Sequence, residues 1–150
     1  MGCIFNYDTK EFDFISKDNV EFKFSLRCRT VIKGDSGSGK TYLVELIQDR
    51  QRAERENDEE STMPNVTVIT NKEAVDTIRK VKRHLIIIDR ADYILNEDAV
   101  KYINSDCNNI YLIYSRKQIG LEISPNYVGK LKRIGNIITL EYEYSIGGWF

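Results

Sequence analysis

Residues 34–41 read G-D-S-G-S-G-K-T, and this glycine-rich stretch decides the fold that we expect. Its three glycines let the backbone turn so tightly that successive N–H groups converge on one anion. Lys40 adds a positive charge, and Thr41 opens the following helix with a hydroxyl suited to a magnesium ion. The free N–H groups and the dipole of that helix also favour anions. The stretch therefore predicts a loop that binds the phosphates of a nucleoside triphosphate.

The residues around this stretch fit such a loop. Residues 29–32 (R-T-V-I) predict a strand before it, and residues 42–47 (Y-L-V-E-L-I) predict the apolar face of a helix after it. The helix should run on into the charged residues 49–60, which we interpret as a solvated helix end that frays into a surface loop.

A second signal is the run H-L-I-I-I-D at residues 84–89. An unbroken apolar run is typical of a strand that is buried on both faces of a parallel sheet. The carboxyl ends of such strands line the crevice where ligands of open α/β sheets bind. Asp89 is therefore the expected magnesium-site acid, acting together with Thr41.

These two motifs resemble Walker A and Walker B of the P-loop NTPase superfamily. The resemblance implies an α/β fold in three layers, with a mainly parallel sheet between helices, and a site for ATP or GTP with Mg²⁺. Asn71 and Lys72 resemble the start of the guanine-binding motif N-K-x-D, but the position of its aspartate is taken by Ala74, which cannot accept hydrogen bonds from guanine. We therefore expect ATP. The expected nucleotide-binding residues are Gly34, Asp35, Ser36, Gly37, Ser38, Gly39, Lys40, Thr41 and Ser115, and the metal-binding ones Thr41 and Asp89.

The rest of the chain predicts further strands and helices. Alternating apolar and charged residues from Phe12 to Leu26, with a turn at 17–19, predict an antiparallel β-hairpin at the N-terminus. After Pro64 the pattern alternates between strands and helices. The strands are expected at 66–70, 85–88, 110–114 and 137–142, and the helices after Asn71 and at 97–103. We expect one domain over 1–150, with a hairpin element at 1–28, a nucleotide-binding core at 29–144 and an aromatic tail at 145–150.

The residues for ATP hydrolysis are less clearly marked. Many ATPases of the superfamily place a glutamate directly after the Walker B aspartate, whereas this chain has Arg90. Glu73 could orient the attacking water if the strand before it lies beside the phosphate loop, and Asp92 is an alternative. Ser115 and Arg116 end the strand at 110–114 and resemble the γ-phosphate sensor of AAA and helicase-like proteins. The expected catalytic residues are thus Lys40, Asp89, Glu73 and Arg116.

Three functions remain open. The first is a Mg²⁺-dependent ATPase whose nucleotide state changes its contact with a protein partner. The second is a non-hydrolysing, ATP-dependent binding module, which the missing acid after Asp89 favours. The third is a small-molecule or nucleotide kinase, for which Lys130, Lys132 and Arg133 would have to supply the basic lid.

Composition limits the partners and the location. The formal net charge of -1 indicates neither nucleic acid nor an anionic membrane as a partner. The apolar stretches are strand-sized, so we expect no membrane span and a cytoplasmic protein. Cys3, Cys28 and Cys107 are too widely spaced for a zinc site or a disulfide framework, and His84 is expected to pack or cap. The terminal Trp149 and Phe150 could dock in another subunit, so self-association is possible.

Overall fold

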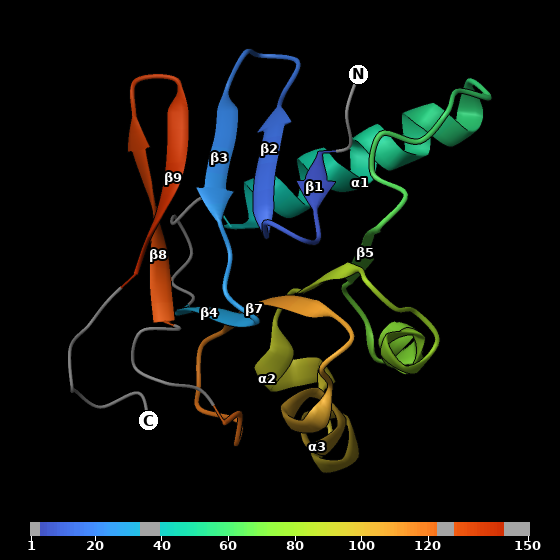
Figure 1. Ribbon diagram of the computed structural model, residues 1–150, viewed down its shortest axis with the longest axis vertical. Coiled ribbons are helices and arrows are strands. Elements are labelled where there is room, and N and C mark those ends of the chain that lie inside the picture. The colour runs from blue at the N-terminus through green and yellow to red at the C-terminus, as the bar shows by residue number, and fades with distance from the viewer. Residues whose placement is uncertain (1–3, 34–39, 123–127, 143–150) are drawn as a thin grey trace.

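The computed structural model describes residues 4–33, 40–122 and 128–142. Within these ranges nine strands form one sheet in the order β1-β2-β3-β9-β8-β4-β7-β6-β5 (Figure 1). The strands are β1 (Phe5–Asn6), β2 (Glu11–Ile15), β3 (Glu21–Ser25), β4 (Arg29–Lys33), β5 (Val66–Ile69), β6 (Leu85–Ile88), β7 (Ile110–Ser115), β8 (Val128–Ile134) and β9 (Ile137–Tyr142). The helices are α1 (Lys40–Glu56), the 3-10 helix η1 (Lys72–Arg79), α2 (Ala91–Ile94) and α3 (Glu97–Ser105).

The N-terminal hairpin is present as expected. β2 and β3 pair antiparallel with Phe12 opposite Phe24 and Phe14 opposite Phe22. All four phenylalanines are buried, because alternation along each strand puts them on one face. The turn between the strands includes Asn19, whose φ of 61° lies in the left-handed region that asparagine tolerates.

The strands that carry the two motifs form a parallel part of the sheet. β8, β4, β7, β6 and β5 are neighbours in this order, and each pair of them is parallel. Every residue of β6 and of β7 is buried, as the sequence predicts for strands covered on both faces. β7 lies between β4 and β6, so the strand before the glycine-rich stretch and the strand before Asp89 are separated by one strand.

Two apolar clusters cover the two faces of this parallel part. On one face, Leu43 and Ile47 of α1 pack with Leu112 of β7 and with the hairpin phenylalanines. On the other face, residues of η1, α2 and α3 pack against Ile86 and Ile113. Figure 1 shows α1 crossing behind β1, β2 and β3, while α2 and α3 lie together beneath β7.

The sheet curls until its two edges almost meet. The Ile4 amide donates to the Thr62 carbonyl oxygen at 3.1 Å, just before β5, and Asn65 Nδ2 donates to the Phe5 carbonyl oxygen at 3.0 Å. Nearby, the Arg83 guanidinium bonds Asp8 at 2.8 Å. β1 at one edge is thus tied to the chain that enters β5 at the other, and the sheet is nearly closed.

The expected three-layer α/β fold with a mainly parallel sheet is therefore wrong. The chain forms a nearly closed, mixed nine-stranded sheet with few helices. The N-terminal hairpin joins this same sheet through the parallel pair β3–β9. Because the sheet curls, the hairpin strands pack together with α1 on the face where a full layer of helices was expected. The alternating pattern of the hairpin predicts an apolar face that must be buried, but does not specify which surface buries it.

Two segments also differ from the sequence-based prediction. β8 was not expected; it runs parallel to β4 and then forms a hairpin with β9 through a two-residue turn, in which Gly135 has a φ of 61°. The charged run at 49–60 is not simply a frayed end, because α1 continues to Glu56 and the side chain of Glu54 is buried.

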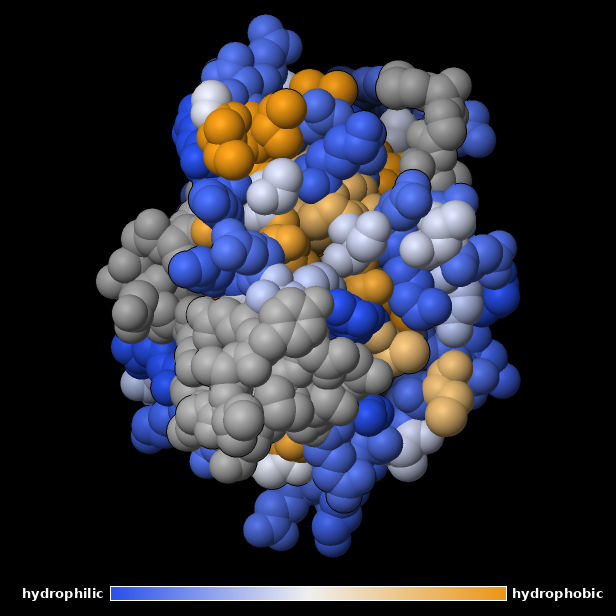
Figure 2. Space-filling model, turned by 60° about the vertical axis from the view of Figure 1, so that its left-hand side comes forward, coloured by the Kyte–Doolittle hydropathy of each residue, from blue (hydrophilic) through white to orange (hydrophobic). Residues whose placement is uncertain are grey.

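The outer surface is mostly hydrophilic (Figure 2). An apolar group stands out at the top of that view, where the tip of the β8–β9 hairpin lies and where Ile134 and Ile137 are exposed. These two residues pair across the hairpin, so each side chain partly shields the other from solvent, although neither is buried in one of the apolar clusters. None of the described helices combines the length and the apolar character needed to cross a lipid bilayer.

Candidate functional site

Polar residues stand at the carboxyl ends of the neighbouring parallel strands. In register, Lys33 at the end of β4 lies opposite Ser115 at the end of β7, and Ile88 at the end of β6 lies opposite Ile113. Because the three strands are parallel, their carboxyl ends share one edge of the sheet, which is where α/β proteins place ligands. Asp89 follows β6 directly at this edge, as the sequence predicted.

Asp89 has a buried oxygen without a partner. Its amide continues the sheet by donating to the Ile69 carbonyl oxygen at 3.0 Å, but its Oδ1 atom is buried and has no hydrogen-bond partner in the described part of the chain. Leu85 and Ile87 face α1, so alternation along the strand directs Asp89 toward α1 as well. A buried, unpaired acceptor costs about 1–3 kcal/mol. This cost is explained if the oxygen binds a ligand.

Tyr114 follows Ile113 on the strand next to Asp89, and the sequence analysis missed it as a site residue because it only placed Tyr114 at the end of the expected strand at 110–114. Its side chain is fully buried, and its hydroxyl also has no partner within the described ranges. Burial raises the pKa of the Tyr114 hydroxyl, and the neighbouring charge of Asp89 raises that pKa further. The only sequence signal for this contact is the alternation, which becomes readable once β6 and β7 are known to be neighbours.

The expected phosphate loop can be located only by its ends. Gly34, Asp35, Ser36, Gly37, Ser38 and Gly39 lie outside the described residues. Lys40 and Thr41 are the first two residues of α1, as expected. The first turn of α1 carries no acidic residue, whereas those of η1 and α3 do. The N-terminal dipole of α1 is therefore not neutralised by a carboxylate of its own first turn.

Ser115 and Arg116 are joined to α2 through Asp92. One carboxylate oxygen of Asp92 accepts from the Arg116 amide at 3.2 Å and from the Ser115 hydroxyl at 3.5 Å. The Ser115 hydroxyl lies closer to the Lys117 carbonyl oxygen, at 2.7 Å. The Arg116 guanidinium lies 5.6 Å from the centre of the Tyr93 ring. Asp92 is thus a structural acceptor here, which argues against its role as the base that activates water.

Glu73 does not meet the condition set for it. The strand before it, β5, is at the edge of the sheet and is separated from β4 by β6 and β7. The Glu73 side chain is exposed in the first turn of η1, where its negative charge interacts favourably with the helix dipole. The condition that the strand before Glu73 lies beside the phosphate loop is therefore not met, and the sequence alone does not reveal this strand order.

Arg90 has a special backbone conformation directly after Asp89. Its φ of 52° and ψ of 51° are left-handed, and its guanidinium donates to the Thr70 carbonyl oxygen at 3.4 Å. The chain thus turns from β6 into α2 at Arg90. Its side chain binds the exit of β5 rather than standing in for the missing glutamate.

The basic residues considered for a kinase lid are placed along β8. Lys132 pairs with Glu141 at 3.6 Å, and the Arg133 Nε atom donates to the Gly135 carbonyl oxygen at 2.9 Å. Both contacts lie within the β8–β9 hairpin: Lys132 reaches across to β9, and Arg133 bonds the turn. Lys130 is exposed one residue beyond the pairing of β8 with β4.

A metal site built from protein groups alone is absent from the described ranges. No three His, Cys, Asp or Glu side chains in them cluster closely enough to hold a metal ion. Mg²⁺ in nucleotide sites needs only one or two protein oxygens, because phosphate and water supply the rest. The free carboxylate oxygen of Asp89 fits this requirement.

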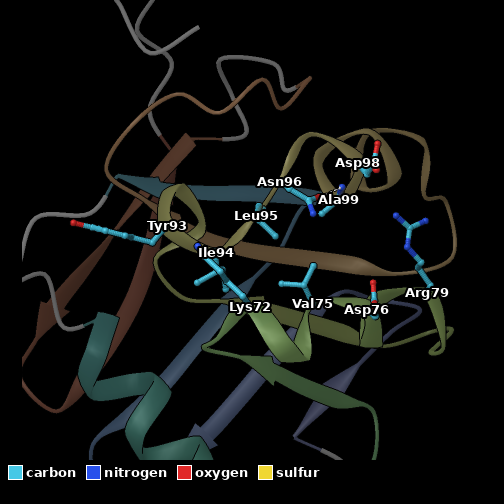
Figure 3. Close-up of a pocket in the computed structure, with 10 residues that line it drawn as sticks. All are labelled: Lys72, Val75, Asp76, Arg79, Tyr93, Ile94, Leu95, Asn96, Asp98 and Ala99. Carbon is cyan, nitrogen blue, oxygen red and sulfur yellow. Dashed lines mark hydrogen bonds between the residues drawn. The ribbon is translucent and has the colours of Figure 1, made fainter.

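A cavity of about 470 Å³ lies between η1 and the α2–α3 segment. Figure 3 shows the apolar side chains of Val75, Ile94 and Leu95 toward its middle, with Arg79 and Asp98 on the right of the view. Its lining carries charges of both signs and includes none of the residues predicted to bind phosphate or metal. The cavity is therefore a separate feature, on the sheet face opposite α1.

The remaining candidates have structural roles. The His84 Nδ1 atom is 2.9 Å from the Thr67 hydroxyl, and partial burial lowers the pKa of the imidazole. Cys28 and Cys107 are free, exposed thiols, and Cys3 lies outside the described residues, as does the aromatic tail.

Comparison of the chain with protein-family models, with curated proteins and with solved structures found no match.

Proposed function

We propose that this protein binds ATP with Mg²⁺ at the edge where β4, β7 and β6 end, and that it hydrolyses ATP to change its contact with a protein partner. Residues 34–41 would hold the phosphates, and Thr41 and Asp89 would hold the metal ion. When bound, Mg²⁺ neutralises phosphate charge. The partner and a cytoplasmic location remain predictions from the sequence.

The observation that carries the proposal is the free, buried Oδ1 atom of Asp89. It lies at the carboxyl end of β6, on the sheet face that α1 covers, and α1 begins with Lys40 and Thr41. The start of α1, which has no acidic residue in its first turn, suits an anion such as phosphate. The unpaired carboxylate oxygen of Asp89 suits a cation bound beside it. This combination supports the proposal that the two motifs of the sequence form one site.

Binding without hydrolysis is the second candidate, and a specific observation favours it. Arg90 takes the place of the expected glutamate and is bound to the exit of β5, while Glu73 is exposed at the sheet edge. Asp92 is occupied by Ser115 and Arg116. Neither Glu73 nor Asp92, the two acids considered for water activation, is thus free beside the expected phosphate loop.

The test is calorimetric titration of the purified protein with Mg-ATP and Mg-GTP, together with an assay for ADP and phosphate release. We expect Mg-ATP to bind, and we expect Lys40→Ala to weaken binding about 10- to 100-fold, the effect of losing one charged hydrogen bond. Lys72→Ala is the matched control, because this exposed lysine begins η1 rather than α1.

The release assay separates the candidate functions. Turnover without an acceptor that is lost in Lys40→Ala supports the ATPase, and binding without turnover supports the second candidate. ADP release only in the presence of an acceptor would indicate a kinase. No heat with either nucleotide would exclude all three.

A further inference from the structure

Two buried polar atoms without partners lie at the same place, the ends of β6 and β7. They are Asp89 Oδ1 and the Tyr114 hydroxyl oxygen, and neither has a hydrogen bond within the described residues. Native proteins leave few buried polar atoms unpaired. Two of them side by side therefore call for a common explanation.

The strand register brings the two side chains together. Ile88 lies opposite Ile113, so Asp89 and Tyr114 occupy the next pair of positions on neighbouring strands. Leu85, Ile87 and Tyr114 belong to the apolar cluster that packs against α1, and alternation directs Asp89 to the same face. In keeping with this placement, the Asp89 charge adds to the effect of burial in raising the pKa of the Tyr114 hydroxyl.

The chemistry of the pair is complementary, but the two groups do not bond directly. A hydroxyl can donate one hydrogen bond, and an ionised carboxylate only accepts. A water molecule between them would accept from Tyr114 and donate to Asp89, so that both buried atoms would be satisfied. A carboxylate fixed in this way keeps one orientation toward a metal ion.

We propose that Tyr114 is a positioning residue for the metal site, whose hydroxyl holds Asp89 through a bridging water in the orientation that binds Mg²⁺. This inference rests on the proposed function. Tyr114 acts through Asp89 and contacts neither the nucleotide nor the metal ion.

Tyr111 provides a matched control on the same strand. It is equally buried, but it belongs to the opposite cluster, and its hydroxyl donates to Asp106 Oδ2 at 2.6 Å. Removal of the Tyr111 hydroxyl breaks a direct hydrogen bond to another side chain, whereas the Tyr114 hydroxyl makes no direct hydrogen bond to the described residues. The two Tyr→Phe variants should therefore behave in opposite ways.

The experiment compares Tyr114→Phe, Tyr111→Phe and the wild type in Mg²⁺ titrations at fixed ATP and in thermal unfolding without nucleotide. We expect Tyr114→Phe to need about 10-fold more Mg²⁺ for half-maximal binding, which is typical for loss of a group that orients a metal ligand. Its ATP affinity in EDTA and its Tm should not fall. Tyr111→Phe should lower the Tm and leave the Mg²⁺ requirement unchanged.

A double variant shows whether Tyr114 acts through Asp89. If it does, Asp89→Asn/Tyr114→Phe should be no weaker in its Mg²⁺ response than Asp89→Asn alone. The inference is overturned if Tyr114→Phe has the wild-type Mg²⁺ requirement, or if it lowers the Tm as much as Tyr111→Phe. Absence of nucleotide binding by the wild type would overturn the proposed function as well, so the two failures are distinguishable.

Discussion

At the scale of single residues, His84 couples folding stability to pH near neutrality. Burial lowers its pKa in the folded protein, whereas the unfolded chain keeps the ordinary value of about 6.5. As the pH falls below this value, the unfolded chain takes up a proton first, so the free energy of unfolding should decrease. The decrease should end below the lowered pKa of the folded protein. Urea unfolding of the wild type and His84→Gln between pH 5 and 7.5 would measure it.

Any pH dependence that comes from an imidazole must come from His84, because it is the single histidine of the chain. In His84→Gln the free energy of unfolding should vary less across this range, and Thr67 should retain a side chain with which to bond. A pH dependence that is equal in both proteins would show that carboxyl groups, and not the imidazole, cause it.

At the scale of elements, the end of α1 is held by the buried side chain of Glu54. Its Oε2 atom accepts from the Thr62 amide at 3.1 Å and from the Thr62 hydroxyl at 2.7 Å, which fastens the loop before β5 to the helix. Glu54→Ala should lower the free energy of unfolding by about 1–3 kcal/mol, because the partly buried amide and hydroxyl of Thr62 lose their acceptor. Denaturant unfolding would measure the loss. The exposed Glu56→Ala should change stability by less than about 0.5 kcal/mol, and equal losses would contradict this role of Glu54.

Elements were predictable from the sequence where the pattern is local. The apolar run before Asp89, the hairpin around 17–19 and the Asn71 cap, which accepts from the Ala74 amide at 2.9 Å, are all found as expected. Strand order is not a local property, so neither the separation of Glu73 from β4 nor the adjacent positions of Asp89 and Tyr114 could be predicted. Glu54 was read as solvated because the residues around it are charged, although its partner Thr62 lies beyond the helix.

At the scale of the whole molecule, the hairpin and the parallel strands share one apolar cluster. Phe22 of β3 is fully buried in the cluster that also contains Leu85, Leu112 and Leu43 of α1. The protein should therefore unfold in one cooperative step, although the sheet has an antiparallel and a parallel part. Phe22→Leu should lower stability by about 1–2 kcal/mol through the partly unfilled space. Amide hydrogen exchange should show that same loss in β2–β3 and in β6–β7, and Lys23→Ala, exposed on the same strand, should show almost none. Faster exchange confined to the hairpin would mean that β1–β3 opens as a separate unit and that the nearly closed sheet does not act as one structure.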